Sequence, residues 1–259
     1  MGNSLRRRRA LNGPTNRGVA KMDWQFELDG KSREKQRLRS LALAYNCTVR
    51  PGPAGTFCLG GDRFSNMATP QEALADAATT LARLNGLARL ENPEHYIVYL
   101  GNDYYQDRIQ RHVKPHPVRS RYGQDDYEFV VTLPGMSIDP HVPPADAKRR
   151  EAIMADSKLV EILEVFAAEE MTWQRLRVAF EKIGALVGKG DNALVKHKYA
   201  TQDELTNFKK NAEDPRHTGH DAVHGVPRGE LRGTKMTESE GLNFVRRLFN
   251  DYVEKKYPL

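Results

Sequence analysis

The sequence predicts an α+β protein with a sheet-containing first half and an all-helical second half. Short segments with alternating apolar and polar residues, typical of strands, occur up to residue 133, and the last expected strand covers residues 127–133. Amphipathic segments with helical spacing fill the chain from residue 146 onward. Prolines at positions 134, 140, 143 and 144 separate the two halves. We therefore expect an α+β domain over residues 22–133, a linker over 134–145 and a helical bundle domain over 146–259.

The first half is expected to begin with a strand, a helix and a hairpin. Residues 24–28 alternate apolar and polar side chains, as a half-buried strand does. Residues 32–45 place Leu38, Leu41 and Ala42 at helical spacing. Turn residues 51–55 then join two short strands into a hairpin; these strands cover residues 47–50 and 56–59.

A second helix and a closing strand complete this unit. Thr69, Pro70 and Glu72 form a capping box with proline in the first turn, which predicts a helix start. The helix is expected to end at Asn85-Gly86, and a strand follows at residues 95–100. The resulting order, β-α-β-β-α-β, is that of a ferredoxin-like unit. This fold hosts many unrelated functions and predicts none of them.

The second half predicts four or five amphipathic helices. An apolar face runs through residues 146–168, and Thr172 is placed to cap the helix after it. Two further capping boxes, Thr201 with Glu204 and Thr237 with Glu240, start later helices. Short connections between such helices favour a bundle.

The net charge of +6 resides in a tail. Residues 1–21 contain six basic residues and no acid, so the rest of the chain is balanced. Such a tail can be a disordered extension or a basic arm that contacts phosphate groups. A membrane-surface anchor starting at Met1-Gly2 is a third reading, although Arg6 stands where a myristoylation signal has Ser or Thr.

Other compositional features predict a cytoplasmic protein without a membrane span. No apolar run approaches the ~20 residues that cross a bilayer, and the start of the chain lacks the apolar core of a secretory signal. Cys47 and Cys58 form neither a disulfide framework nor a zinc set. No phosphate loop or other motif predicts a cofactor.

Residues 102–125 combine basic and aromatic side chains. Single-stranded nucleic acid is bound by such a combination, in which cations contact phosphates and rings stack on bases. A solvated loop is the alternative interpretation. The candidate residues for binding RNA or DNA are Arg108, Arg111, Lys114, Arg119, Arg121 and Tyr122.

Three histidines fall within eight residues of the second half. In a helix, His217, His220 and His224 would share one face, because they are spaced i, i+3 and i+7. With Asp221 they could bind a transition metal. With Arg216 they could cleave RNA without a metal, histidine moving protons and arginine stabilising the charged phosphorane. A surface loop with incidental histidines is the third interpretation.

The last sixty or so residues resemble HEPN-type helical domains. The resemblance rests on a helix, a segment with Arg216, His220 and His224 that ends in His-Gly, and a capped amphipathic helix. Such domains are often RNA-cleaving parts of prokaryotic toxin and antiviral defence systems. Their arginine and histidine would correspond to Arg216 and to His220 or His224, which follow it after three and seven intervening residues.

The sequence thus leads to three functional hypotheses. The first is a non-enzymatic binding or assembly module, a subunit of a bacterial defence or nucleic-acid-handling complex that acts with a protein partner or as a homo-oligomer. The second is a HEPN-like, metal-independent ribonuclease. The third is a metal-dependent hydrolase that uses His217, His220 and His224.

Overall fold

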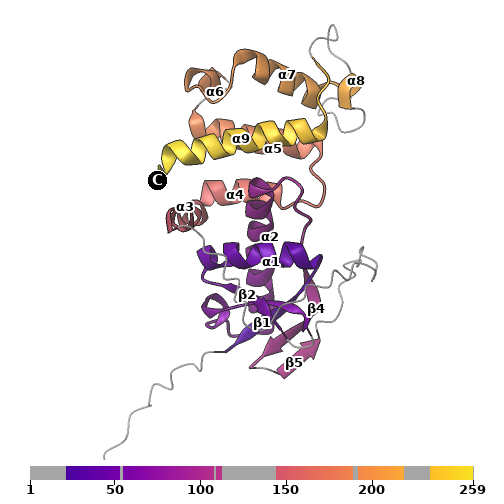
Figure 1. Cartoon of the computed structure of the whole chain (residues 1–259), viewed down its shortest axis with the longest axis vertical. Helices are drawn as coiled ribbons and strands as arrows, with labels where there is room; N and C mark the ends of the chain where they lie inside the picture. The colour runs from indigo at the N-terminus through magenta and orange to yellow at the C-terminus, as the bar shows by residue number, and fades with distance from the viewer. Residues whose placement is uncertain are drawn as a thin grey trace, which may run out of the picture.

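The computed structural model describes residues 22–52, 55–107, 109–112, 144–188, 192–218 and 234–258. It confirms the α+β class, with a five-stranded antiparallel sheet and helices stacked beyond it (Figure 1). The first half contains β1 (Trp24–Asp29), α1 (Ser32–Ala42), η1 (Leu43–Tyr45), β2 (Thr48–Pro51), β3 (Phe57–Gly60), η3 (Asp62–Phe64), α2 (Pro70–Glu91), β4 (Tyr99–Gln106) and β5 (Ile109–His112). The second half contains α3 (Pro144–Ala155), α4 (Ser157–Phe166), α5 (Trp173–Val187), α6 (Asn192–Lys196), α7 (Gln202–Glu213), α8 (Pro215–Thr218) and α9 (Glu238–Lys256).

The sheet has the strand order β2-β3-β1-β4-β5, and each neighbouring pair is antiparallel. The central strand β1 buries alternate residues, so Trp24, Phe26 and Leu28 point toward the helices. Phe26 lies opposite Leu59 on β3 and Tyr104 on β4. The predicted alternation of residues 24–28 is therefore confirmed.

Helix α2 continues past its expected end at Asn85-Gly86 and reaches Glu91. The prediction was wrong because both residues serve tertiary contacts. Asn85 hydrogen-bonds to Val98, and Gly86 lies against α4, where a Cβ on it would be 2.1 Å from the carbonyl oxygen of Leu163. An Asn-Gly pair that caps a helix and one that allows close packing look alike in a sequence.

The strand expected at residues 95–100 begins later and is longer. β4 runs from Tyr99 to Gln106 and turns at Asp107, whose φ is +50°, into β5. Part of the segment interpreted as a loop is thus sheet. The expected strand at 127–133, the tail 1–21 and most of the linker 134–145 lie outside the described residues.

The helix expected over residues 146–168 is two helices. Asp156 has an extended backbone and accepts hydrogen bonds from the N–H groups of Lys158 and Leu159, so it caps α4. The predicted caps at Thr69, Thr172, Thr201 and Thr237 are all present, three of them as full capping boxes.

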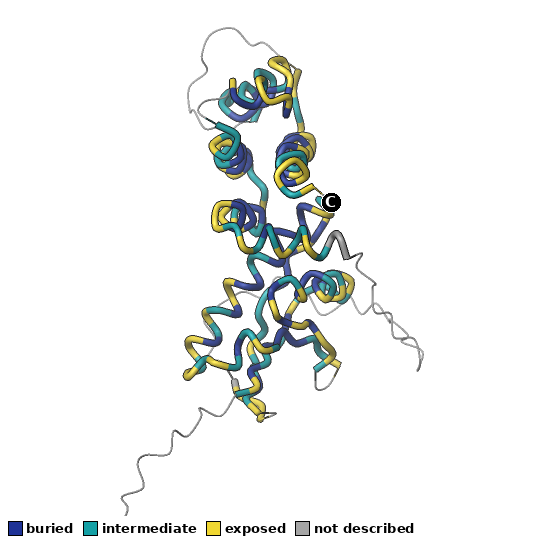
Figure 2. Tube along the Cα trace, turned by 90° about the vertical axis from the view of Figure 1, so that its left-hand side faces the viewer, coloured by how far each residue is buried: buried dark blue, intermediate teal, exposed yellow. Residues whose placement is uncertain are grey.

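The helices form successive layers: α3 and α4, then α5 and α9, then α6 and α7 (Figure 1). Helix α2 rises from the sheet and packs along α4, so it belongs to both halves. One apolar core therefore runs from Phe26 through Leu84 and Leu163 to Phe249, and Figure 2 shows buried residues continuing from the sheet into the stacked helices. None of the helices in the described ranges is long and apolar enough to cross a membrane.

Candidate functional site

The Arg216 side chain is held by a neighbouring carboxylate. Asp214 follows α7, and Arg216 lies in α8, two residues further on. Its Nε donates to Asp214 Oδ1 at 2.9 Å and its Nη2 to Oδ2 at 2.5 Å. This two-point contact lowers the pKa of Asp214 to about 2. The guanidinium is thus paired with a carboxylate of the same chain, although the residue itself is exposed.

His217 is turned inward, unlike a catalytic histidine on an open face. It is buried, and its Nε2 has no hydrogen-bond partner among the described residues. Helix α8 includes only residues 215–218. His220 and His224 lie outside the described residues, so the expected shared face is not tested. Within the described ranges, no three His, Cys, Asp or Glu side chains are grouped as metal ligands would be.

Helix α7 anchors the chain on both sides of residues 219–233. At one end, α8 packs against α7. At the other end, Asn211 Nδ2 donates to the Thr234 carbonyl at 2.8 Å, and Asn211 Oδ1 accepts from the Met236 N–H at 2.8 Å. Asn207 Oδ1 accepts from the Thr234 N–H at 3.0 Å. The i, i+4 spacing of Asn207 and Asn211 on one helix face was the available sequence signal for these contacts.

Of the basic and aromatic candidates in residues 102–125, the structure describes only Arg111. Arg111 is exposed on β5, opposite Tyr104 of β4. Its expected partners all fall outside the described residues, and they are Arg108, Lys114, Arg119, Arg121 and Tyr122. The proposed grouping of these side chains therefore stays a prediction.

The sheet surface that faces away from the helices carries acidic side chains. Glu27 of β1 and Asp103 of β4 both point to this side, since their neighbours Phe26 and Tyr104 point to the helices. Burial raises the pKa of Glu27, and the nearby Asp103 adds to this shift. These two carboxylates would repel a phosphate backbone at this part of the sheet.

A row of basic side chains lies where the C-terminal end of α9 meets α3, α4 and α6. Figure 1 places α3, α6 and the chain's C-terminus along one side of the molecule. Residues 147–158, 192–198 and 251–258 hold eight Lys or Arg and four Asp or Glu residues. We call seven of the basic residues the basic edge: Lys148, Arg149, Lys158, Lys196, Lys198, Lys255 and Lys256.

Contacts between the helices fix the positions of the basic edge. Lys256 Nζ donates to Asp156 Oδ2 at 2.6 Å, which joins α9 to the start of α4. Lys255 Nζ donates to the His197 carbonyl at 2.9 Å, which joins α9 to the turn after α6. Arg149 Nε donates to the Tyr257 carbonyl at 3.4 Å, which joins α3 to the end of α9. The basic edge is thus one continuous surface built from four helices.

Three of its lysines are free cations. Lys148, Lys196 and Lys198 are exposed and contact no carboxylate in the described part of the chain. Lys198 has a φ of +59°, so its backbone turns sharply between α6 and α7. Four carboxylates lie in the same segments, and one of them, Asp156, is paired with Lys256. This surface could not be predicted from the sequence, because its residues come from three separate segments between Lys148 and Lys256 that meet only in the folded chain.

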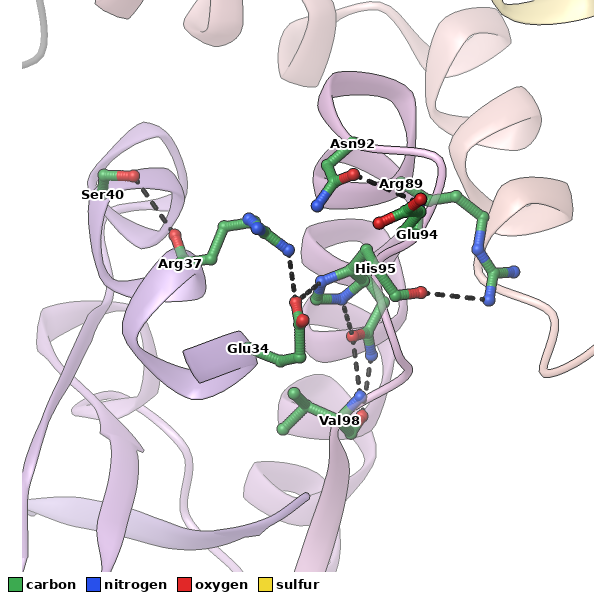
Figure 3. Close-up of polar contacts among 9 residues, drawn as sticks. Glu34, Arg37, Ser40, Arg89, Asn92, Glu94, His95 and Val98 are labelled. Carbon is green, nitrogen blue, oxygen red and sulfur yellow. Dashed lines mark hydrogen bonds and ion pairs between the residues drawn. The ribbon is translucent and has the colours of Figure 1, made fainter. Parts of the chain in front are cut away.

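A buried polar network joins α1 to the connection between α2 and β4 (Figure 3). His95 is 2% exposed, and its Nδ1 lies 2.6 Å from Glu34 Oε2. Arg37 forms an ion pair with the same carboxylate. The other ring nitrogen, Nε2, lies 3.0 Å from Asn85 Oδ1. Burial lowers the pKa of His95, and the hydrogen bond to Glu34 opposes this shift.

Asn85 determines which histidine nitrogen carries a hydrogen. Its Nδ2 donates to the Val98 carbonyl at 2.7 Å, and its Oδ1 accepts from the Val98 N–H at 2.9 Å. The amide cannot be flipped without losing both bonds, so Oδ1 faces His95 as an acceptor. His95 Nε2 is therefore the donor in the contact with Asn85, and Nδ1 faces the Glu34 carboxylate.

Arg89 links this network to the second half. Its guanidinium donates to the carbonyls of Phe166, Ala168 and Glu169 at the end of α4. It also donates to the His95 carbonyl (Figure 3). In return, Arg246 of α9 donates to the Leu90 carbonyl at the end of α2. Each arginine caps a helix in the other half. A cavity of 540 Å³ beside Arg89 is lined by Glu94, His95, Tyr96 and Glu169, but every polar group of the network is turned to a partner within the protein.

The sequence matches no protein-family model, and neither curated proteins nor solved structures show a significant match to it. Function must therefore be inferred from the residues alone.

Proposed function

We propose that this protein is a non-enzymatic nucleic-acid-binding and assembly module whose contact surface is the basic edge. The observation that carries the proposal is the group of exposed lysines Lys148, Lys196 and Lys198, which have no acidic partner in the described part of the chain and lie in a row held by α3, α4, α6 and α9. Cations that are not neutralised within the protein release counterions from a phosphate backbone when they bind it.

The engaged state of Arg216 supports a binding role over catalysis. An arginine paired with Asp214 at 2.5 Å must first break this contact before it stabilises a phosphorane. His217, with its buried ring, is also poorly placed to exchange protons with a substrate. The Arg216 contact favours the binding hypothesis over the ribonuclease hypothesis, and the buried ring of His217 favours it over the hydrolase hypothesis; His220 and His224 lie outside the described residues.

We also infer a ferredoxin-like arrangement for the first half and a helical bundle for the second. Support comes from the order β2-β3-β1-β4 with antiparallel neighbours, which places β1 between β3 and β4 as the split β-α-β plan requires. β5 then extends the sheet beyond β4. In the second half, α5 packs against α4, α7 and α9 and has a bundle's central position.

The test compares binding of the full chain and of charge-reversal variants to fluorescent nucleic acids. Lys148→Glu, Lys158→Glu and Lys196→Glu are combined, because none of these lysines forms a side-chain hydrogen bond or ion pair within the described part of the chain. A carboxylate at position 158 is also favourable, since α4 starts there. We expect the dissociation constant to rise at least about tenfold. Lys235→Glu is the matched control, since Lys235 is exposed and precedes the opposite end of the 19-residue helix α9.

Equal binding by the triple variant and the wild type would refute the basic edge as the contact surface. Binding that does not weaken between about 50 and 200 mM salt would likewise refute a phosphate-directed mode.

A further inference from the structure

The proposed function leaves open whether the basic edge binds single strands or duplexes, and three tyrosines on it bear on this choice. Single-strand binders use exposed aromatic rings as platforms for bases. Tyr199, Tyr252 and Tyr257 lie among the lysines of the basic edge and would be those platforms. Their environment decides whether a base can reach them.

The tyrosine rings are already covered. Lys255 Nζ lies 3.9 Å from the ring centroid of Tyr199, and Lys256 Nζ lies 5.6 Å and 5.4 Å from those of Tyr252 and Tyr257. Tyr199 is only 8% exposed and packs against Tyr252 with 6.3 Å between centroids. Each ring thus has a lysine ammonium over one face in a cation–π contact, and that face is not free to stack on a base.

The cations themselves are suited to phosphates and not to base edges. Six of the seven basic-edge residues are lysines, which act as point charges. A guanidinium group could read a base by two parallel hydrogen bonds, and Arg149 is the arginine of the basic edge. Its Nε, however, donates to the Tyr257 carbonyl. Binding at this surface is therefore independent of base sequence.

The fixed spacing of the row favours a stiff ligand. Hydrogen bonds to Asp156 and His197 hold Lys256 and Lys255, and the helices hold the remaining cations. A duplex presents its phosphates in a fixed array at about one charge per 1.7 Å, whereas a single strand must be ordered before it can match the row. We infer that the basic edge binds the phosphate backbone of double-stranded nucleic acid without reading its sequence.

The experiment measures fluorescence anisotropy of the full chain with labelled oligonucleotides. The probes are a duplex DNA, a duplex RNA and the separate strands of each, in two unrelated sequences. We expect at least one duplex to bind more than about tenfold tighter than its strands, with equal affinity for both sequences and a steep salt dependence. The triple variant should lower the salt slope, and Lys235→Glu should leave it unchanged.

Tyr252→Leu separates backbone binding from base stacking. With backbone binding, this variant keeps the wild-type affinity, because the hydrogen bond to Asp156 still holds Lys256; with stacking, it loses about 1–3 kcal/mol, or roughly five- to 150-fold. A melting curve verifies that it is folded. Single strands that bind as tightly as duplexes, or a strong loss in Tyr252→Leu, would overturn the duplex inference while the proposed function stood. If no nucleic acid bound, both would fail.

Discussion

Asn85 is a polar residue in the interior of a helix, a position that normally disfavours asparagine. It is 2% exposed, and its amide satisfies both backbone groups of Val98 as well as the His95 ring. The Asn85 side chain thus makes the two backbone hydrogen bonds with Val98 that a neighbouring strand would otherwise make. The role of Asn85 could not be predicted, because Val98 lies thirteen residues further along the chain and no local sequence pattern connects the two.

Replacing Asn85 with leucine should strongly destabilise the protein. The Val98 N–H, the Val98 carbonyl and His95 Nε2 would all be left buried without partners, at about 1–3 kcal/mol each. We expect a loss of about 3 kcal/mol or more in the free energy of unfolding, measured by urea denaturation. Asn250→Leu, at an exposed position of α9, is the control and should change stability by less than about 0.5 kcal/mol. A small effect at Asn85 would show that the network is dispensable.

Cys47 should be inert in the folded protein. It is 1% exposed, and burial raises the pKa of its thiol to about 12. At pH 8 the thiolate fraction is then on the order of one in ten thousand. Cys58 is also buried, with a raised pKa. We expect no reaction with a disulfide reagent at pH 8 until denaturant is added, when both thiols should react. Rapid labelling of the native protein would contradict this.

At the scale of single elements, local signals were predictive and tertiary ones were not. The capping boxes at Thr69, Thr201 and Thr237 were identified because a cap depends only on residues three positions apart. β5 was missed because its pairing with β4, and not its composition, makes it a strand. The basic edge was missed for the same reason, since α3, α6 and α9 meet only in the folded chain.

Two glycines in helix interiors should respond oppositely to alanine. A Cβ on Gly86 would lie 2.1 Å from the Leu163 carbonyl oxygen, so α2 and α4 would have to separate. We expect Gly86→Ala to cost about 3 kcal/mol. At Gly184 of α5 the nearest atom is 3.9 Å away, so Gly184→Ala should gain about 0.5–1 kcal/mol from higher helix propensity. Melting temperatures of both variants test this, and equal shifts would be inconsistent with a close α2–α4 crossing.

The Asp156 contact between α4 and α9 should depend on pH. Burial opposes ionisation, but hydrogen bonds from Lys256 and from two backbone N–H groups outweigh it and lower the pKa of Asp156. Its contribution to stability is therefore present above the unfolded-state pKa of about 3.9 and is lost as pH falls through the lower folded value. Asp156→Asn keeps a capping residue, so we expect it to melt below the wild type at pH 7 and at the same temperature near pH 2. A difference that persists in acid would assign the effect to packing.

On the scale of the whole molecule, α2 makes the two halves one cooperative unit. Its side chains extend the sheet's core into the core of the stacked helices, and Arg89 and Arg246 cap helices across the same junction. The α+β class and the order of elements were predictable from periodicity. The shared core was not, because the early helix end expected at Asn85-Gly86 removed the part of α2 that enters the second half.

The two tryptophans can test this cooperativity. Trp24 is buried in the sheet half and Trp173 in the helical half. In single-tryptophan variants, Trp24→Phe and Trp173→Phe, fluorescence reports each half separately. For each variant, the urea midpoint from fluorescence is compared with the midpoint from circular dichroism of the same variant. We expect the two midpoints to coincide in both variants. Separate midpoints would mean that the halves unfold independently.

Because α2 contributes to the cores of both halves, the contact between the halves should survive a cut in the backbone that joins them. Between His112 and Pro144 the chain passes from the last described strand to the first helix of the second half. If a protease site engineered there were cut, the N-terminal fragment would still hold the surface of α2 that α4 and α9 cover. The fragments should therefore stay associated without a peptide bond, and the two pieces, produced as separate polypeptides, should reassemble by fragment complementation.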